Sequence, residues 1–564
     1  MPSSGRVTYN SDDEIEPLLK GTADGVERKS SVAVPVPSTE PPATYRSRWR
    51  SIRIMYLTMF LSSVSFSICM SSLWPYLKVL HPDSTANSLG WVVAAYSLGQ
   101  LVASPLFGKW ANWRKRNREP LIFSITINIL ANILYAYLES IPSDRQYYLL
   151  VARVFVGFGA GNVAVVRSYM SAATTMTERT GAMANMSAFQ AIGFIIGPGI
   201  QAALAPIGYP GPINTTAFHF NMYTSPAFLS AAVGVVNIVL LIVVFEDYRV
   251  YDDGDVTFSI SNSINEERII PDYKPNLTAV LASVFLFFSA LFIFAVFETI
   301  GTPLTMHMYA WSRQQATMNN GIILAVGGII SIFVFMIIKL LSKRVNERYL
   351  LLGGFLFCFA GFFVFLPWGN EYPPYENARM LKQVNVYMSE CNFSISPSGP
   401  NITAHPYVSP MLSINTTSSV TTVTTTTGGS TTTVEPRGCP DAYVWCSTVP
   451  VVRFSQFLVG TFLITIGYPT CNVMSYSIYS KILGPKPQGT MMGLLTAAGS
   501  LARTVGPIYV SEMYDTFGPR VTFSSVSGLI VFTVIVMIFI FKKLVPFTFK
   551  NTSTSSNRNN KRKG

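Results

Sequence analysis

The chain has 564 residues, of which 49% are hydrophobic and only 12% are charged, and its formal net charge is +12. Soluble domains carry about 25% charged residues, so this composition excludes an ordinary soluble protein. The positive balance does not require nucleic acid, because Lys and Arg accumulate on the cytosolic side of membrane proteins. We therefore expect the lipid bilayer to be the partner of this chain, and we expect no nucleic-acid partner.

Residues 1–50 are polar and rich in Pro and Ser, which predicts a disordered cytosolic tail. Within the tail, three residues separate Glu14 from Leu18 and Leu19. An acidic residue at this spacing from a Leu-Leu pair is the dileucine pattern that clathrin adaptors bind, and it predicts sorting to endosomes and lysosomes. A chance match in an acidic tail is the alternative.

After the tail, the chain contains twelve apolar stretches that are long enough to cross a bilayer. A helix needs about 20 apolar residues to cross a hydrocarbon core of about 30 Å. The stretches are residues 52–77, 89–110, 120–138, 147–170, 182–204, 224–245, 277–304, 321–341, 349–367, 451–476, 491–509 and 521–541. They predict an all-α membrane protein with twelve transmembrane helices.

The twelve stretches fall into two sets of six. The fifth stretch contains Gly197-Pro198, and the eleventh, which is the fifth of its own set, contains Gly506-Pro507. A helix breaker at the same place in each set indicates a duplicated unit and predicts two pseudo-symmetric six-helix bundles. The predicted parts are an N-terminal bundle (51–245), a cytosolic linker (246–276), a C-terminal bundle (277–543) and a basic cytosolic tail (544–564).

Basic residues indicate the orientation in the membrane. They gather around the start of the first stretch, between the second and third stretches, and after the last one, so all three groups fall on one face. These residues are Arg46, Arg48, Arg50, Arg53, Lys109, Arg114, Lys115, Arg116, Arg118, Lys542 and Lys543. Both termini are therefore expected in the cytosol.

The long loop 369–450 is then expected in the lumen. Its Thr-rich run, residues 416–433, is typical of O-glycosylated tracts. N-glycosylation sequons occur in this loop and in the loop after the fifth stretch. The four sequons are at Asn214, Asn392, Asn401 and Asn415.

Three cysteines, Cys391, Cys439 and Cys446, lie in this loop. An oxidising compartment would allow a disulfide there. We favour a bridge between Cys439 and Cys446, which leaves Cys391 unpaired, although other pairings remain open.

Short motifs within this frame resemble the major facilitator superfamily. Residues 108–116 resemble the signature loop with which that family latches its cytosolic helix ends, although Asn112 stands at the usual Asp. Arg153, Gly157 and Gly159 resemble its Arg-x-x-x-Gly-x-Gly motif. The resemblance implies the major facilitator fold, which is a pair of six-helix bundles.

Residues 193–198 resemble the opening of the antiporter-associated signature, but Ile200 and Gln201 replace the glycines that complete it, which weakens an antiport interpretation. Longer strings resemble a lysosomal branch of the superfamily that is linked to chloride permeation. These strings are residues 47–54, 96–108, 156–169, 298–311 and 480–489. The resemblance implies a multi-pass protein of the lysosomal and endosomal membrane that supports lysosomal ion and pH homeostasis.

Charged residues inside a membrane are costly and mark transport pathways, so those within the stretches are the leading site candidates. Among the charged residues inside the stretches, arginines outnumber the single carboxylate. A cavity lined by these residues would have a positive potential and would attract anions. The candidates are Arg153, Arg167, Glu298, Arg453 and Arg503.

Glycines near these charges are expected to interrupt helices and to let backbone dipoles approach a solute. They are Gly157, Gly159, Gly161 and the glycines of the pairs Gly197-Pro198 and Gly506-Pro507.

Each charged candidate has an alternative role. Arg153 lines a cavity or ties helices together. Arg167 and Arg453 lie near the ends of their stretches, where snorkelling to the interface is favoured over solute contact. Arg503 lies mid-stretch and is the favoured solute contact. Glu298 binds protons or holds a fixed partnership with an arginine.

His307 lies at the luminal end of its stretch. One expected role is to sense luminal acidity. The other, which we favour, is that of an ordinary residue at the membrane interface.

Two function classes follow from these residues. The first is permeation of a small anion such as chloride, and the second is proton-coupled transport of an organic anionic solute. A non-transporting scaffold or receptor is a weaker third class. The sequence contains no nucleotide-binding loop, no nucleophile with a positioned base and no metal-ligand spacing, so we expect neither an enzyme nor a cofactor.

Overall fold

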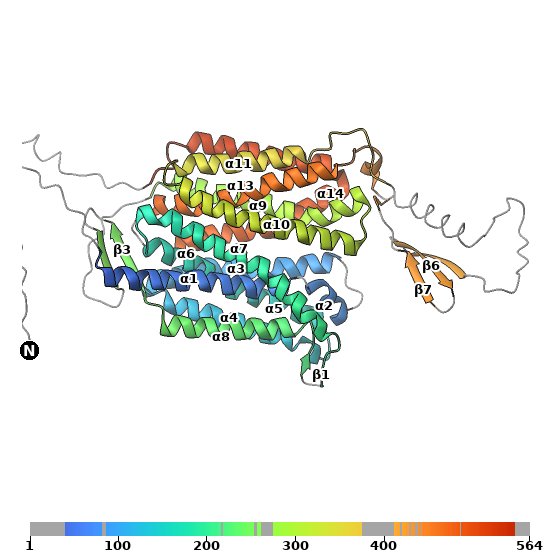
Figure 1. Ribbon diagram of the computed structural model, residues 1–564, viewed down its shortest axis with the longest axis horizontal. Helices are drawn as coiled ribbons and strands as arrows, with labels where there is room; N and C mark the ends of the chain where they lie inside the picture. Colours follow the sequence, from blue (N-terminus) through green and yellow to red (C-terminus); the bar gives the residue numbers. More distant parts are fainter. Residues whose placement is uncertain are drawn as a thin grey trace, which may run out of the picture. The chain divides into compact units, whose positions relative to one another are not determined.

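The structure is a computed structural model, and its core is a set of long helices (Figure 1). Eleven of the described helices are long and apolar enough to cross a membrane. The described residues are 40–70, 72–81, 86–215, 218–252, 256–260, 275–374, 411–417, 420–427, 430–434, 438–440, 443–484 and 487–546. Glu14, Leu18, Leu19, Cys391, Asn392 and Asn401 lie outside these ranges.

The first half of the chain forms the helices of one bundle. They are α1 (Pro42–Ile68), α2 (Leu73–Leu80), α3 (Ala86–Arg114), α4 (Arg118–Ala136), α5 (Arg145–Gly159), α6 (Asn162–Ala172), α7 (Met176–Leu204) and α8 (Ser225–Val243), with short 3₁₀ turns Leu138–Ser140 and Ala205–Ile207. Helix α1 therefore begins inside the segment that was expected to be a disordered tail.

The second half forms α9 (Leu277–Tyr309), α10 (Arg313–Leu341), α11 (Glu347–Val364), α13 (Phe454–Leu483) and α14 (Gly489–Ile540), with a 3₁₀ turn at Val444–Ser447. Helix α14 has 52 residues, far more than one crossing needs. Gly518, with φ of 76°, interrupts it and is followed by Pro519. The two parts of α14 match the stretches 491–509 and 521–541, so the expected twelve crossings are present.

Gly518 is required at this break because φ is positive and because the side chain of Trp445 packs directly on it. A Cβ at this position would lie 2.7 Å from the Trp445 ring. We expect Gly518→Ala to lower stability by about 1–3 kcal/mol, since left-handed backbone is costly for residues with a Cβ. Thermal unfolding of the purified protein measures this. Gly528→Ala, later in α14 where a Cβ meets nothing within 4 Å, is the matched control and should be neutral or slightly stabilising.

Three antiparallel sheets lie outside the helices, and the sequence analysis did not predict them. They pair β1 (Ile213–Asn214) with β2 (His219–Phe220), β3 (Tyr248–Asp252) with β4 (Val256–Ile260), and β5 (Met411–Thr417) with β6 (Val420–Thr427) and β7 (Ser430–Val434). Most of β6 and β7 is Thr and Val, which favour strands. The all-α class is confirmed for the membrane-spanning core.

The expectation that both Gly-Pro pairs break their helices was wrong. Helix α7 continues through Pro198 and α14 continues through Pro507. Gly197 instead permits close packing, since a Cβ there would lie 1.9 Å from the Ser67 hydroxyl. The fourth stretch is the one interrupted, because α5 ends at Gly159 and α6 begins at Asn162.

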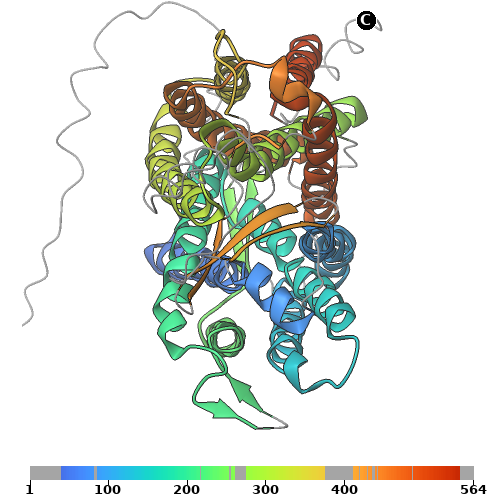
Figure 2. The same ribbon diagram turned by 90° about the vertical axis from the view of Figure 1, so that its right-hand side faces the viewer.

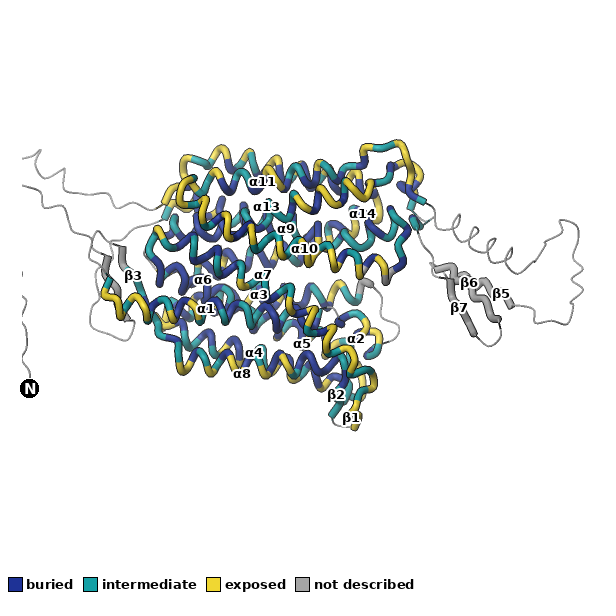
Figure 3. The backbone as a smooth tube through the Cα atoms, viewed as in Figure 1, coloured by how far each residue is buried: buried dark blue, intermediate teal, exposed yellow. Residues whose placement is uncertain are grey.

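The two halves meet where α3 packs along α14 and where α7 packs along α10. Viewed from one end, the blue-to-green helices of the first half group apart from most of the yellow-to-red helices of the second (Figure 2). Exposed residues alternate with buried ones along the outer helices (Figure 3). Many exposed side chains are large and apolar, among them Phe539 at 82% and Val243 at 75% exposure. Such a surface suits contact with lipid and would be a liability in water.

Candidate functional site

The two ends of the helix bundle differ in chemistry. The end at which α1 begins, α3 ends and α14 begins is called the basic end, because Lys109, Arg114 and Lys115 lie there. The opposite end carries the short loop containing Cys439 and Cys446 and is called the loop end. These two cysteines form a disulfide, the pair favoured from the sequence.

A first latch joins the halves at the basic end. The Asn112 side chain, at the end of α3, accepts a hydrogen bond from the Gly489 backbone N–H (2.8 Å) and donates one to the Thr490 hydroxyl (3.0 Å). Gly108 and Gly489 allow this approach, since a Cβ on Gly108 would lie 2.1 Å from the Gly489 carbonyl oxygen. Asn112 therefore acts as a latch through its amide although the family motif has an acid.

A second latch centres on Glu347 at the start of α11. Its carboxylate accepts hydrogen bonds from Lys481 Nζ (2.7 Å) and the Ser477 hydroxyl (2.9 Å), both on α13. The hydroxyl of Thr180, from α7 in the other half, donates to the same carboxylate oxygen. The hydroxyls of Thr180 and Ser477 lie 2.8 Å apart, so one of them can donate its single proton to the other in place of the carboxylate. Three helices from the two halves are thus joined by one carboxylate.

Further hydrogen bonds continue the closure towards the middle of the bundle. Ser480 donates to the Ser171 hydroxyl (2.7 Å), and Ser500 donates to Gln100 Oε1 (3.0 Å). Between described residues, the hydrogen bonds that join the halves lie at the basic end or near the middle of the bundle. The halves are therefore fastened together at the basic end.

Beyond this closure, Arg503 and Glu298 lie on facing helices. Glu298 of α9 is exposed although it lies well inside a helix, and Arg503 of α14 is half-buried. The two charges and the half-buried Tyr468 of α13 are close enough to interact electrostatically. Within the described chain, neither Glu298 nor Arg503 has an ion-pair partner within 4.0 Å. The arrangement places one cation and one anion on facing helices without a direct bond between them.

Arg153 of α5 is buried with 2% exposure inside the first half. Its guanidinium lies 5.4 Å from the ring centre of Tyr96 and 5.8 Å from that of Phe66. One Nη lies 3.0 Å from the Met70 sulfur, and Nε has no hydrogen-bond partner in the described part of the chain. Of its two expected roles, these contacts fit packing between helices, with the charge uncompensated by any described carboxylate.

The expectation that Arg167 snorkels to the interface was wrong. Arg167 is 1% exposed, and its guanidinium stacks on Tyr476 of the other half at 3.6 Å from the ring centre. Packing against the other half encloses this residue, and its position near the end of an apolar stretch does not reveal that packing.

Arg453 and His307 lie at the loop end. Arg453 is 63% exposed at the start of α13, with Glu371 at 3.8 Å, so it lies away from the contact between the halves. The His307 ring bonds to the Tyr514 hydroxyl at 3.2 Å beside Trp445 of the disulfide loop. His307 thus belongs to an aromatic cluster and is not a plain interfacial residue.

In the disulfide loop, burial raises the pKa of Tyr443 to about 12, and its hydroxyl donates to Asp515 at 3.0 Å.

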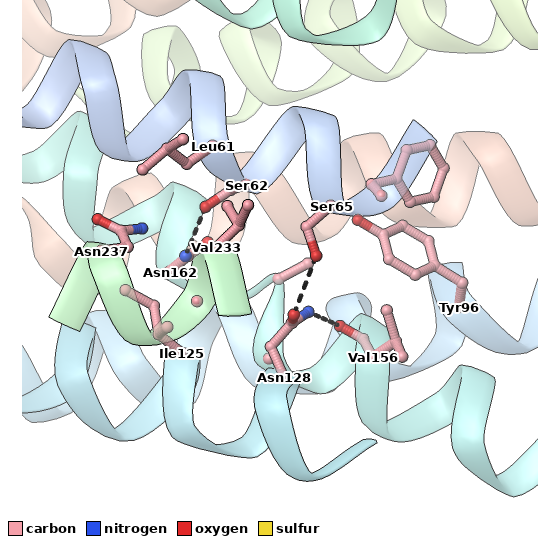
Figure 4. Close-up of a pocket in the computed structure, with 14 residues that line it drawn as sticks. Leu61, Ser62, Ser65, Tyr96, Ile125, Asn128, Val156, Asn162, Val233 and Asn237 are labelled. Atoms are coloured by element: carbon pink, nitrogen blue, oxygen red, sulfur yellow. Dashed lines mark hydrogen bonds between the residues drawn. The ribbon is translucent and has the colours of Figure 1, made fainter. Parts of the chain in front are cut away.

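A small pocket of about 30 Å³ lies within the first half, among α1, α3, α4, α5, α6 and α8 (Figure 4). Asn162 donates to the Ser62 hydroxyl at 3.2 Å, and Ser65 donates to Asn128 at 3.3 Å (Figure 4). Its lining mixes apolar side chains with serines and asparagines and contains no charged residue. Sequence reasoning missed these residues because it weighed only charges, whereas the asparagines inside three stretches were a usable signal.

The remaining candidates are peripheral. Asn214 lies exposed in β1, with its side chain 2.7 Å from a ring nitrogen of His219, and Asn415 lies in β5. Within the described ranges, no group of His, Cys, Asp or Glu is arranged to hold a metal ion.

Comparisons with known proteins agree with this geometry. Residues 55–380 match the sequence profile of the Major Facilitator Superfamily. The chain is 47% identical over 544 residues to the Xenopus laevis protein called major facilitator superfamily domain-containing protein 8, covering 95% of this chain and 98% of that protein.

Solved structures show the same fold. The human organic anion transporter MFSD10 has a TM-score of 0.54 at 14% identity, covering 88% of this chain and 100% of the transporter. The proton:xylose symporter XylE has a TM-score of 0.57 at 10% identity, covering 89% and 97% of the two chains. At these identities the likeness concerns the fold alone.

Proposed function

Because the chain belongs to the major facilitator superfamily, a family of membrane transporters, we propose that it moves small anions, with chloride as the first candidate. One observation carries the proposal. Arg153 and Arg167 are buried in the bundle and Arg503 is half-buried, whereas among the described residues the one carboxylate that acts on any of these three charges is Glu298, beside Arg503. An excess of cations in a low-dielectric interior favours anions over cations.

The two latches support movement by alternating access. In this conformation the basic end is closed by Asn112 and Glu347 with their partners across the halves. Beyond the closure, Glu298 is exposed and Arg503 is half-buried. An anion held near Arg503 would cross when the latches release and the halves rock about the site.

The proposal includes a cellular setting. The basic residues favour a cytosolic basic end and cytosolic termini, and the dileucine pattern at Glu14, Leu18 and Leu19 favours binding of clathrin adaptors. The loop end would then face the lumen of endosomes and lysosomes, where Asn214 and the other sequons could carry glycans. Anion movement in that membrane would support lysosomal ion and pH homeostasis.

A second candidate function is proton-coupled transport of an organic anion. Glu298 favours it, because an exposed carboxylate close to Arg503 is placed to gain a proton and thereby release the arginine charge. The two candidates differ in whether solute movement needs a protonatable group at this position.

Uptake of radiolabelled chloride into liposomes containing the purified protein tests the proposal. We expect Arg503→Gln to lower the initial rate by about tenfold or more, since a lost charged partner costs about 2–5 kcal/mol and 1.4 kcal/mol is tenfold. Arg453→Gln is the matched control and should leave the rate unchanged. Chloride uptake no faster than in empty liposomes would rule out the first candidate.

Glu298→Gln separates the two candidates. Under chloride permeation the variant keeps its uptake, because the carboxylate is not needed. Under proton coupling, uptake of an organic anion depends on the pH gradient and is lost in this variant.

A further inference from the structure

Arg167 is a guanidinium enclosed between the two halves with most of its donors unused. Its Nη2 donates to Gln190 Oε1 at 3.0 Å, while Nε and Nη1 are buried and have no partner among the described residues. Buried polar groups are nearly always bonded, and a buried charge without compensation is costly. A residue held in this state needs a functional explanation.

Tyr476 covers the face of this guanidinium. The ring lies on α13 of the other half, 3.6 Å from the Arg167 guanidinium carbon, and Phe287 of α9 holds it edge-on at 4.7 Å between ring centres. Cation–π attraction compensates a desolvated arginine only in part, because the ring supplies no hydrogen-bond acceptor. The contact exists only while the halves are together.

Two neighbours show that the contact belongs to the closed basic end. Ser171, one turn further along α6, bonds to Ser480 of the other half. Arg503 of the other half lies near enough to repel the Arg167 charge. Closure therefore brings two cations towards each other and leaves donors of Arg167 unpaired.

We infer that Arg167 is an anion-binding residue of the transport pathway, and that Tyr476 occupies its face when the basic end is closed. When the halves separate there, the ring leaves and the free N–H donors can bind a small anion such as chloride. Ring and anion compete for one guanidinium, so anions favour the conformation that is open at the basic end. The inference rests on the proposed anion transport and names one of its binding residues.

A cysteine at Ser500 reports the opening. Ser500 is 2% exposed and bonds to Gln100 across the halves, so a thiol reagent reaches it when they part. The test uses Ser500→Cys in the full-length chain, with Cys391 replaced by serine, in lipid nanodiscs. Labelling rates are compared in chloride and in gluconate at equal ionic strength.

We expect chloride to raise the labelling rate about threefold or more. This corresponds to chloride binding the conformation open at the basic end about threefold more tightly than the closed one. Arg167→Gln should abolish the chloride effect, and Arg167→Lys should keep part of it. Arg453→Gln, the matched control, should keep all of it. The inference is overturned if Arg167→Gln responds to chloride as the parent does, or if the parent does not respond.

Thermal unfolding in gluconate excludes a purely structural role. Arg167→Gln removes a buried, poorly paired charge, so its unfolding temperature should equal or exceed that of the parent. A clear fall would identify Arg167 as a packing residue and overturn the inference. A chloride-dependent labelling rate combined with no chloride uptake into liposomes would leave the binding residue standing and reject the proposed transport.

Discussion

Gly489→Val is expected to prevent closure of the basic end and to abolish solute movement while leaving the protein folded. A Cβ on Gly489 would lie 2.3 Å from the Gly108 carbonyl oxygen and 2.5 Å from Asn112 Oδ1. The Gly108 backbone cannot retreat without separating α3 from α14, and the Asn112 side chain would have to turn away and lose its hydrogen bond to the Gly489 N–H. Since each cycle of alternating access requires this closure, we expect uptake to fall by about 100-fold, which corresponds to about 2.7 kcal/mol against the closed conformation.

Two measurements check this prediction. Anion uptake into liposomes gives the loss of activity, and labelling of a cysteine at Ser500 gives the separation of the halves. Gly90→Val is the matched control, because Gly90 lies in α3, the helix that faces Gly489, and a Cβ at Gly90 meets nothing within 4 Å. Normal uptake by Gly489→Val would show that the first latch does not have to close.

Lys481→Met is expected to destabilise the protein strongly, because it leaves the Glu347 carboxylate partly buried without its cation. The side chains of Lys481 and Glu347 are 14% and 11% exposed and lie 2.7 Å apart. Removing one member of a buried pair costs about 3–5 kcal/mol, whereas replacing both by neutral groups costs much less. The double variant Lys481→Met, Glu347→Gln should therefore recover most of the lost stability.

A double-mutant cycle on thermal unfolding measures this coupling, and we expect about 2 kcal/mol. Lys343→Met, at an exposed position near the same end, should be neutral. Additive effects of the two single changes would mean that the pair contributes no coupling energy. If the double variant recovers its stability but not its uptake, the contact between Thr180 and the Glu347 carboxylate is needed for transport and not only for stability.

Much of the fold could be predicted from the sequence because its determinants are local. Apolar length predicts each crossing, and the gap between stretches 491–509 and 521–541 anticipates the break at Gly518. The Gly-Pro pairs misled because a proline inside a membrane helix need not end it where neighbouring helices pack closely, as Ser67 does at Gly197.

The contacts of the site could not be predicted because they join residues far apart in the chain. Asn112 meets Gly489 across 377 positions, and no local pattern specifies that approach. Glu347 and Lys481 flank their apolar stretches and look like ordinary interfacial charges until α7 brings Thr180 to them. Arg167 looked interfacial for the same reason, since only packing against Tyr476 shows that it is enclosed.

The central claim is that anions are the moving species. The most direct test replaces the anion or the cation in liposomes that contain the wild-type chain. Chloride is exchanged for gluconate in one arm and sodium for N-methylglucamine in the other, and net charge movement is followed under an imposed potential. We predict that the flux falls to the level of empty liposomes in gluconate and is unchanged in N-methylglucamine. A flux that follows sodium and ignores chloride would contradict the role given to the cationic interior around Arg503.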